Sequence, residues 1–148
     1  MILNEKKGNL FELNDRYTLV HCISEDCEMG AGIAVEFKKR FGMKTYLLET
    51  IQQVPKYYPC AIFYPFSKQG VINMITKKKY WNKPTYESFT KSLIEVRDIC
   101  KDQDIKYLAL PKIGAGLDRL QWGEIREIIQ EEFKDQDIEI LICRYHKH

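Results

Sequence analysis

Hydrophobic runs separated by turn residues recur along the chain and predict about six β-strands. The runs are rich in β-branched and aromatic residues, which suit a pleated sheet. The predicted strands are Ile2–Glu5, Tyr17–Ser24, Cys60–Phe66, Val71–Thr76, Tyr107–Lys112 and Ile138–Tyr145. Only Ser67–Gly70 connects the third strand to the fourth, and such a short connection predicts an antiparallel hairpin.

Apolar residues at helical spacing lie between these strands and predict helices. The stripes are Ile33, Phe37 and Phe41; Phe89, Leu93, Val96 and Cys100; and Ile125, Ile128, Ile129 and Phe133, with a weaker pattern over Tyr46–Gln53. Pro84-Thr85 suits the start of the helix that contains Phe89. Alternating strands and helices predict an α/β fold, with helices on both faces of a mixed sheet. No linker or repeat divides residues 1–148, so we expect a single domain.

Length and charge narrow the class of protein. A chain of 148 residues with 45% hydrophobic residues is long enough to bury its own core, which favours a monomer. The 23 basic and 21 acidic residues nearly cancel, so nucleic acid is not the default partner. The five cysteines lie mostly in apolar runs, as core residues of a protein in a reducing cytoplasm would. No signal peptide or membrane span is predicted, because charges appear from Glu5 onward and no apolar run is long enough.

Two glycine loops each follow a predicted strand and precede a predicted helix. The first contains Gly30, Ala31 and Gly32 and opens the helix at Ile33 and Ala34; the second is Ile113, Gly114, Ala115, Gly116 and Leu117. Small residues let backbone N–H groups approach an anion, and the helix N-terminus adds a favourable dipole. One such loop alone is more often a tight turn, but two at equivalent strand ends favour a diphosphate site. Neither loop fits the P-loop pattern, which disfavours ATP or GTP hydrolysis.

Lys77 ends an apolar strand and begins the basic run Lys77–Lys79, which Tyr80 and Trp81 follow. Such a run is either a solvated loop or a surface for nucleic acid. Partial burial of Lys77 beside Lys78 would lower its pKa and supply the neutral amine that a nucleophile needs. Asp118, directly after the second glycine loop, suits either proton transfer or the capping of a helix.

His21 and Cys22 suggest a Cys-His dyad or a metal site, and both interpretations fail. Adjacent strand residues point to opposite faces of a sheet, so the two side chains cannot face each other. Together with Asp26 and Cys27 they also lack a second ligand pair at zinc-like spacing. We therefore expect no metal.

Four segments of the chain resemble the macrodomain family, in particular its terminal ADP-ribose protein glycohydrolase branch, also described as O-acetyl-ADP-ribose deacetylases. They are Gly8–Phe11, His21–Ala34, Ile75–Lys78 with Lys83–Tyr86, and Ile113–Trp122. The resemblance extends over nearly the whole chain. It implies a three-layer α/β/α sandwich with a mixed six-stranded sheet.

The resemblance also implies a reaction. The lysine at the position of Lys77 would attack the anomeric carbon of the distal ribose and release the modified carboxylate. The aspartate at the position of Asp118 would then help to resolve the lysyl intermediate. The implied substrates are ADP-ribosylated glutamate or aspartate side chains of proteins and O-acetyl-ADP-ribose, and no metal or organic cofactor is required.

The same resemblance assigns the binding residues. The loops Gly30–Ala34 and Ile113–Leu117 would hold the pyrophosphate and distal ribose, Ser24 would lie near the sugar, and adenine would lie against Leu10. The family usually has aspartate where Asn9 stands. The neutral amide still accepts a hydrogen bond from adenine, but more weakly than a carboxylate.

Two other functions compete with this one. In the first, Lys77 is only a solvated cation and the chain is a reader that binds ADP-ribose without turnover. In the second, the Lys77–Trp81 run follows a nucleic-acid strand by charge and stacking, and the substrate is ADP-ribosylated DNA or RNA.

Overall fold

A six-stranded sheet forms the middle layer of the part of the chain that the computed structural model describes, residues 1–30, 32–53, 58–113 and 120–144. Its order is β1-β6-β5-β2-β4-β3. The strands are β1 (Ile2–Lys7), β2 (Thr18–Ser24), β3 (Cys60–Tyr64), β4 (Val71–Lys77), β5 (Tyr107–Leu110) and β6 (Glu139–Arg144). All six predicted strands are therefore present, although Tyr145 lies outside the described residues.

The sheet is mixed, as predicted. β3 pairs antiparallel with β4 through the hairpin at Ser67–Gly70, and the other neighbouring strands pair in parallel. Two strands end earlier than predicted, because proline follows each one and has no N–H to donate to the ladder. Pro65 follows β3 and Pro111 follows β5.

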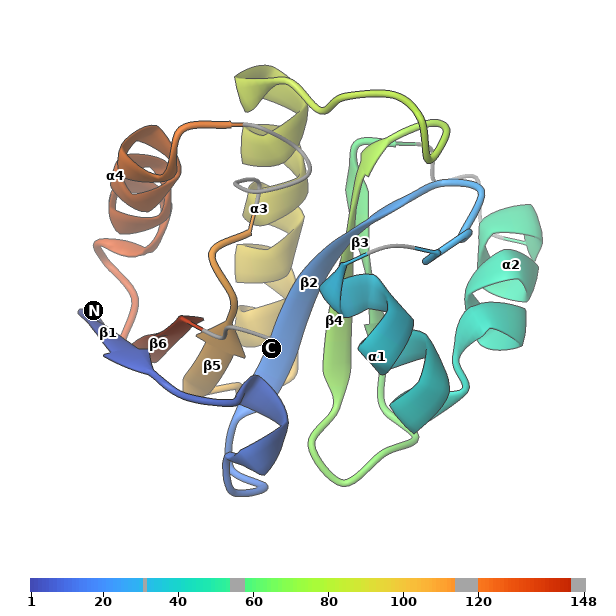
Figure 1. Ribbon diagram of the computed structural model, residues 1–148. Helices are drawn as coiled ribbons and strands as arrows, with labels where there is room; N and C mark the ends of the chain where they lie inside the picture. Colours follow the sequence, from blue (N-terminus) through green and yellow to red (C-terminus); the bar gives the residue numbers. More distant parts are fainter. Residues whose placement is uncertain (31, 54–57, 114–119, 145–148) are drawn as a thin grey trace.

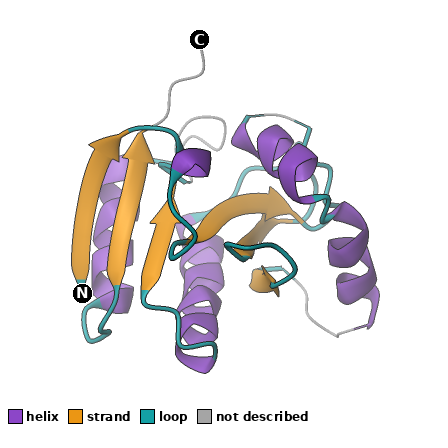
Figure 2. Ribbon diagram, turned by 90° about the horizontal axis from the view of Figure 1, so that it is seen from below, coloured by secondary structure: helices purple, strands orange, loops and turns teal. Residues whose placement is uncertain are grey.

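Four α-helices in the described residues cover the two faces of the sheet. Helices α1 (Ile33–Phe41) and α2 (Lys44–Gln53) lie on one side, and α3 (Tyr86–Asp102) and α4 (Trp122–Phe133) lie on the other (Figures 1 and 2). Thr85 caps α3 by accepting from the N–H of Ser88 at 2.9 Å, so this helix starts one residue beyond the predicted Pro84-Thr85. No helix in the described part of the chain has the length and apolar character needed to span a bilayer.

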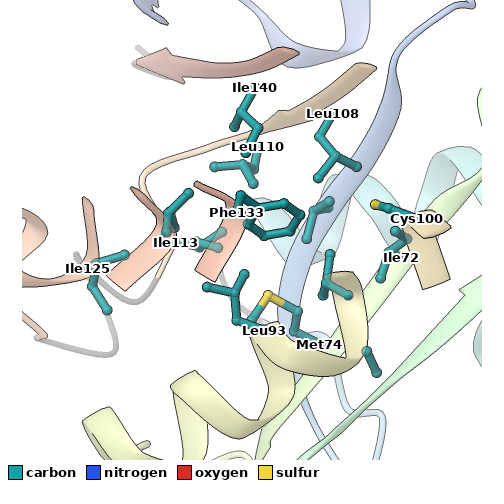
Figure 3. Packing of buried hydrophobic residues seen from close by; sticks show 14 of the residues in the cluster. Ile72, Met74, Leu93, Cys100, Leu108, Leu110, Ile113, Ile125, Phe133 and Ile140 are labelled. Atoms are coloured by element: carbon teal, nitrogen blue, oxygen red, sulfur yellow. The ribbon is translucent and has the colours of Figure 1, made fainter. Parts of the chain in front are cut away.

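Each face of the sheet has its own hydrophobic core, which explains the three layers. On the α3 and α4 side, Phe133 lies among Leu93, Leu108 and Ile140 (Figure 3). On the α1 and α2 side, Phe37 and Leu47 are fully buried. The cysteines contribute as the sequence predicts: Cys27, Cys60, Cys100 and Cys143 are buried and Cys22 is half-buried.

Gly70 in the β3–β4 hairpin occupies a position that glycine alone fits. Its φ is +66°, and an added Cβ would lie 2.9 Å from Cε1 of Phe63. We expect Gly70→Ala to lower the free energy of unfolding in urea by about 2 kcal/mol, through backbone strain and ring crowding. Gly42→Ala is the matched control, because Gly42 also has a positive φ, +58°, but an open surrounding. Gly42→Ala should lower the free energy of unfolding by less than Gly70→Ala does. An equal decrease in the two variants would show that crowding by the Phe63 ring contributes nothing.

Candidate functional site

The carboxyl ends of β2, β4 and β5 lie at one edge of the sheet, because these three strands are parallel neighbours. The first glycine loop follows β2, Lys77 ends β4, and the second glycine loop follows β5. Ser24 and Lys77 are direct register partners. In Figure 1 the chain leaves this edge of β2 to reach α1. The topology thus brings three predicted segments to the same edge.

Lys77 is held at this edge by its backbone. Its carbonyl accepts a hydrogen bond from the N–H of Glu25 at 2.9 Å, which continues the β2–β4 contact beyond the last pair of the ladder. The residue is half-buried, as the sequence predicts. Its backbone is fixed by the sheet, while its side chain borders a cavity.

The cavity beside Lys77 has a volume of about 910 Å³ and lies between the end of β4 and the first turns of α3. We call it the α3-side cavity. Its charged lining residues are Lys77, Lys78, Lys83, Lys91, Glu25 and Glu87. The described residues of the first glycine loop, Gly30 and Gly32 among them, do not line it. Lys77 is therefore the one predicted catalytic residue in the described part of the chain that borders this cavity.

Asp26 ties the first glycine loop to the segment that follows Lys77. Its Oδ2 accepts from the N–H of Tyr80 at 3.0 Å, and its Oδ1 accepts from the hydroxyl of Ser24 and from the N–H of Glu28. The sequence interpretation considered Asp26 only as a metal ligand and missed this role. A carboxylate two residues beyond a strand end was the available signal, since aspartate there readily accepts from nearby backbone N–H groups.

The ionised form of Asp26 is the stabilised one. Burial by itself would raise the pKa of Asp26, but the hydrogen bonds from Ser24, Tyr80 and Glu28, with Lys79 nearby, hold the pKa below its usual range. The carboxylate is thus charged at neutral pH and remains an acceptor on both oxygens.

The first glycine loop leads into α1 as predicted. Gly32 is the N-cap, with φ +62° and ψ −150°, a conformation that favours glycine, and Ile33 begins the helix. Gly32 has no side chain that could cap this N-terminus, so backbone N–H groups remain for a ligand. Gly30 and Ala34 flank this turn, and Ala31 lies outside the described residues.

Only the start of the second glycine loop belongs to the described part of the chain. Ile113 is buried in the α3 and α4 core, and its N–H donates to the carbonyl of Pro111 at 2.7 Å. Gly114, Ala115, Gly116, Leu117 and the predicted catalytic Asp118 lie outside the described residues.

The residues predicted to contact adenine, Asn9 and Leu10, lie near the N-terminus. They stand at the start of a short 3-10 helix, η1 (Leu10–Glu12), which was not predicted from the sequence. Asn9 caps it, because its Oδ1 accepts from the N–H of Phe11 at 2.9 Å. Leu10 is fully buried in the α1 and α2 core.

Alternative nucleophiles near β2 are unsuitable. His21 stacks on Phe37 on the α1 side, whereas Cys22 packs against the α3 and α4 core, so the predicted failure of a Cys-His dyad is confirmed. Burial, with Asp26 nearby, raises the pKa of the Cys27 thiol to about 11. A thiol with this pKa is protonated at neutral pH and is a poor nucleophile.

Comparison with known proteins agrees with this fold. Residues 20–129 match the model of the Macro domain family. A Bos taurus protein named ADP-ribose glycohydrolase OARD1 is 44% identical over 138 residues, covering 92% of this chain and 87% of the relative. A Thermus aquaticus protein named DNA ADP-ribosyl glycohydrolase is 27% identical over 131 residues, covering 84% of this chain and 36% of that protein. The solved macrodomain of Thermus aquaticus DarG superposes with a TM-score of 0.85 at 24% identity, with 99% of both chains covered.

Proposed function

Because the chain belongs to the macrodomain family, we propose that it is an ADP-ribosyl hydrolase that releases ADP-ribose from glutamate and aspartate side chains of proteins. The position of Lys77 carries the proposal: it is a half-buried lysine at the end of β4, in register with Ser24, after which the first glycine loop follows. The bovine relative, which has the name of an ADP-ribose glycohydrolase, supports it.

The first step forms a bond between the Nζ of Lys77 and the anomeric carbon of the distal ribose. The bond from that carbon to the ester oxygen breaks, and the carboxylate leaves with the electron pair. A carboxylate is a good leaving group, so a positioned amine is the main requirement. The attacking nitrogen first carries a positive charge and then gives one proton to water, which leaves a neutral secondary amine bonded to the anomeric carbon.

The second step restores the lysine. Water adds to the anomeric carbon, the carbon–nitrogen bond breaks, and Lys77 leaves with a proton while ADP-ribose is released. We assign Asp118 to the proton transfers of this step, because it directly follows the second glycine loop in the sequence and a carboxylate can accept and return a proton. Nothing in this sequence requires a metal or an organic cofactor.

Binding of the substrate would divide among three regions. The N-terminus of α1 at Gly32 would receive the pyrophosphate, since a helix start attracts anions. Ser24 would lie near the distal ribose. At the adenine end, the amide oxygen of Asn9 has two lone pairs, and Phe11 uses one of them. The second can accept from the adenine amino group.

We propose O-acetyl-ADP-ribose as a further substrate, because the proposed binding contacts are all to the ADP-ribose moiety and none depends on the acyl group. We also propose that the protein is a monomer and is located in the cytoplasm. Burial of four of the five cysteines in the core fits a reducing compartment.

The decisive experiment measures free ADP-ribose released from a glutamate-ADP-ribosylated protein by wild type, Lys77→Ala and Asp118→Ala. Release that both substitutions abolish would establish the hydrolase and its two residues. Binding of ADP-ribose without release by wild type would instead establish a reader.

ADP-ribosylated DNA is a second candidate substrate, which one surface feature favours. Tyr80 and Trp81 are 57% and 65% exposed and pack edge to face, beside the lysines that precede them. Exposed aromatic rings with nearby cations suit single-stranded nucleic acid. Release of ADP-ribose from a modified thymidine oligonucleotide, but not from modified protein, would move the function to this substrate.

Asp26 should position Lys77 without touching the substrate. Asp26→Asn replaces one acceptor oxygen with an N–H donor, so it cannot accept from Ser24, Tyr80 and Glu28 as the carboxylate does. We expect kcat on modified protein to fall by roughly tenfold, because small displacements of a nucleophile cost rate, and KM to rise as well, because Ser24 and the first glycine loop lose the same anchor. Asp15→Asn, which loses only an exposed ion pair with Lys68, is the control. A change in KM alone would show that Asp26 acts on binding instead.

A further inference from the structure

The α3-side cavity has more space than the ester group of the substrate would fill. Its volume of about 910 Å³ is in the range of pockets that enclose a whole small molecule. If ADP-ribose occupies the glycine loops, the anomeric carbon meets Lys77, and the acyl group leaves on the other side. Lys77 lines the α3-side cavity, whereas the described residues of the first glycine loop do not, so the cavity is available to the protein segment that continues from the acyl group.

The lining of the cavity has an excess of positive charge. Four lysines and two glutamates line it, so cations outnumber carboxylates even after Glu87 is paired with Lys91. Glu25 accepts from the N–H of Tyr58 at 2.9 Å, and Glu87 forms an ion pair with Lys91 at 2.9 Å. A chain with a net charge of only +2 thus concentrates cations at this one place.

Two further features favour an anion in the cavity. The N-terminal turn of α3, a helix of 17 residues, contributes Thr85 and Ser88 to the lining, so its dipole reinforces the lysines. Thr76 also lines the cavity, is 1% exposed, and its hydroxyl has no hydrogen-bond partner among the described residues. Buried hydroxyls normally have a partner, so this one can donate to a bound acceptor.

The aromatic residues argue for peptide over nucleic acid as the occupant. Tyr80 and Trp81 do not line the cavity. Tyr58 does, but Lys78 lies over its ring, with Nζ 5.4 Å from the ring centroid. Sites for single-stranded nucleic acid combine cations with open aromatic faces on which bases stack, whereas carboxylates need only the cations and hydrogen-bond donors that this lining supplies.

We propose that the α3-side cavity is an acyl-side subsite that binds an acidic peptide segment flanking the modified glutamate. The inference rests on the proposed function and adds the substrate class: ADP-ribosylated glutamates in acidic stretches. Lys83 and Lys91 supply charge to this subsite and take no part in the chemistry at Lys77.

The test uses two peptides with one ADP-ribosyl-glutamate each, flanked by aspartates in one and by serines in the other. We expect wild type to have a kcat/KM about five- to tenfold higher for the acidic peptide at low salt, mostly through KM. This preference should shrink at about 0.3 M NaCl. The double variant Lys83→Gln/Lys91→Gln should lose the preference while its rate on the serine-flanked peptide stays unchanged. Lys134→Gln, which removes the similar ion pair with Glu131 on the surface beyond α4, should keep the preference.

Three results would overturn the inference, and they are distinguishable. Equal rates on both peptides by wild type would leave the hydrolase in place and remove the acidic subsite. Release from neither peptide would remove the proposed function and the inference with it. Release from an ADP-ribosylated oligonucleotide that falls in the double variant, with no difference between the peptides, would assign the cavity to a nucleic-acid strand.

Discussion

Replacing Lys77 with alanine should reduce the release of ADP-ribose from modified protein by at least about 10³-fold, while the Kd for ADP-ribose changes by less than about threefold. Loss of a nucleophile removes the covalent route itself, and losses of this size are usual for such residues. Binding should persist because the α1 N-terminus at Gly32 is untouched. Single-turnover release and calorimetric binding measure the two quantities separately.

Lys77→Arg separates nucleophilicity from charge. Arginine keeps the positive charge at this position, but its guanidinium stays protonated and cannot attack carbon. It should therefore be as inactive as the alanine variant. Lys79→Ala is the matched control, because Lys79 is an exposed lysine of the same run, and its turnover should stay within about threefold of wild type. Undiminished turnover in Lys77→Ala would remove Lys77 from the mechanism, and full activity in Lys77→Arg would reduce its role to charge.

Local sequence patterns were sufficient for the elements of the fold. The strands could be predicted because each is an apolar run between turn residues, and the antiparallel hairpin because the connection at Ser67–Gly70 is so short. The errors also have local causes. Strand ends were placed too late at Pro65 and Pro111, and η1 was missed because three residues are too few to show a period.

The site could be predicted only in part, because its parts meet through strand register. The glycine turn at Gly32 and the strand-end position of Lys77 are visible in the sequence, since each depends on neighbouring residues. The bond from Tyr80 to Asp26 joins residues 54 apart, and the bond from Tyr58 to Glu25 joins residues 33 apart. Such contacts follow from the pairing of β2 with β4, which no local pattern contains. The charged lining of the α3-side cavity was unpredictable for the same reason.

The surroundings of His21 also follow from strand register, and they determine its ionisation state. It pairs with Asn73 across β2 and β4, and its Nε2 lies 2.6 Å from the Oδ1 of Asn73. The amide nitrogen of Asn73 donates to the carbonyl of Ile62, so Oδ1 is the acceptor and Nε2 carries the proton. Nδ1 is buried with no partner among the described residues, and the ring stacks on Phe37 with centroids 3.8 Å apart. Burial lowers the pKa of His21 to about 4, although the Asn73 bond opposes the shift.

The folded protein should consequently lose stability in mild acid through this one residue. The unfolded chain takes up a proton on His21 below a pKa of about 6.5, whereas the folded chain does so only near 4. Between these values the unfolded state binds more protons, so the free energy of unfolding falls as the pH falls from about 6.5 to 4, by about 3 kcal/mol in all. The contribution is fully present above pH 6.5. Urea unfolding of wild type and His21→Gln at intervals between pH 7.5 and 4 measures it, since every other group titrates in both proteins.

The variant should be less stable at pH 7, because it loses the stack on Phe37, but its stability should depend less steeply on pH. The difference between the two curves isolates the histidine. Should His21→Gln fail to fold, the ring proton resonances of His21 in wild type give the same answer by NMR, and they should not shift between pH 7.5 and 5.5. Parallel stability curves, or a ring that titrates near 6.5, would show that the folded core accepts the charged imidazole and would contradict the closed, apolar surroundings of Nδ1.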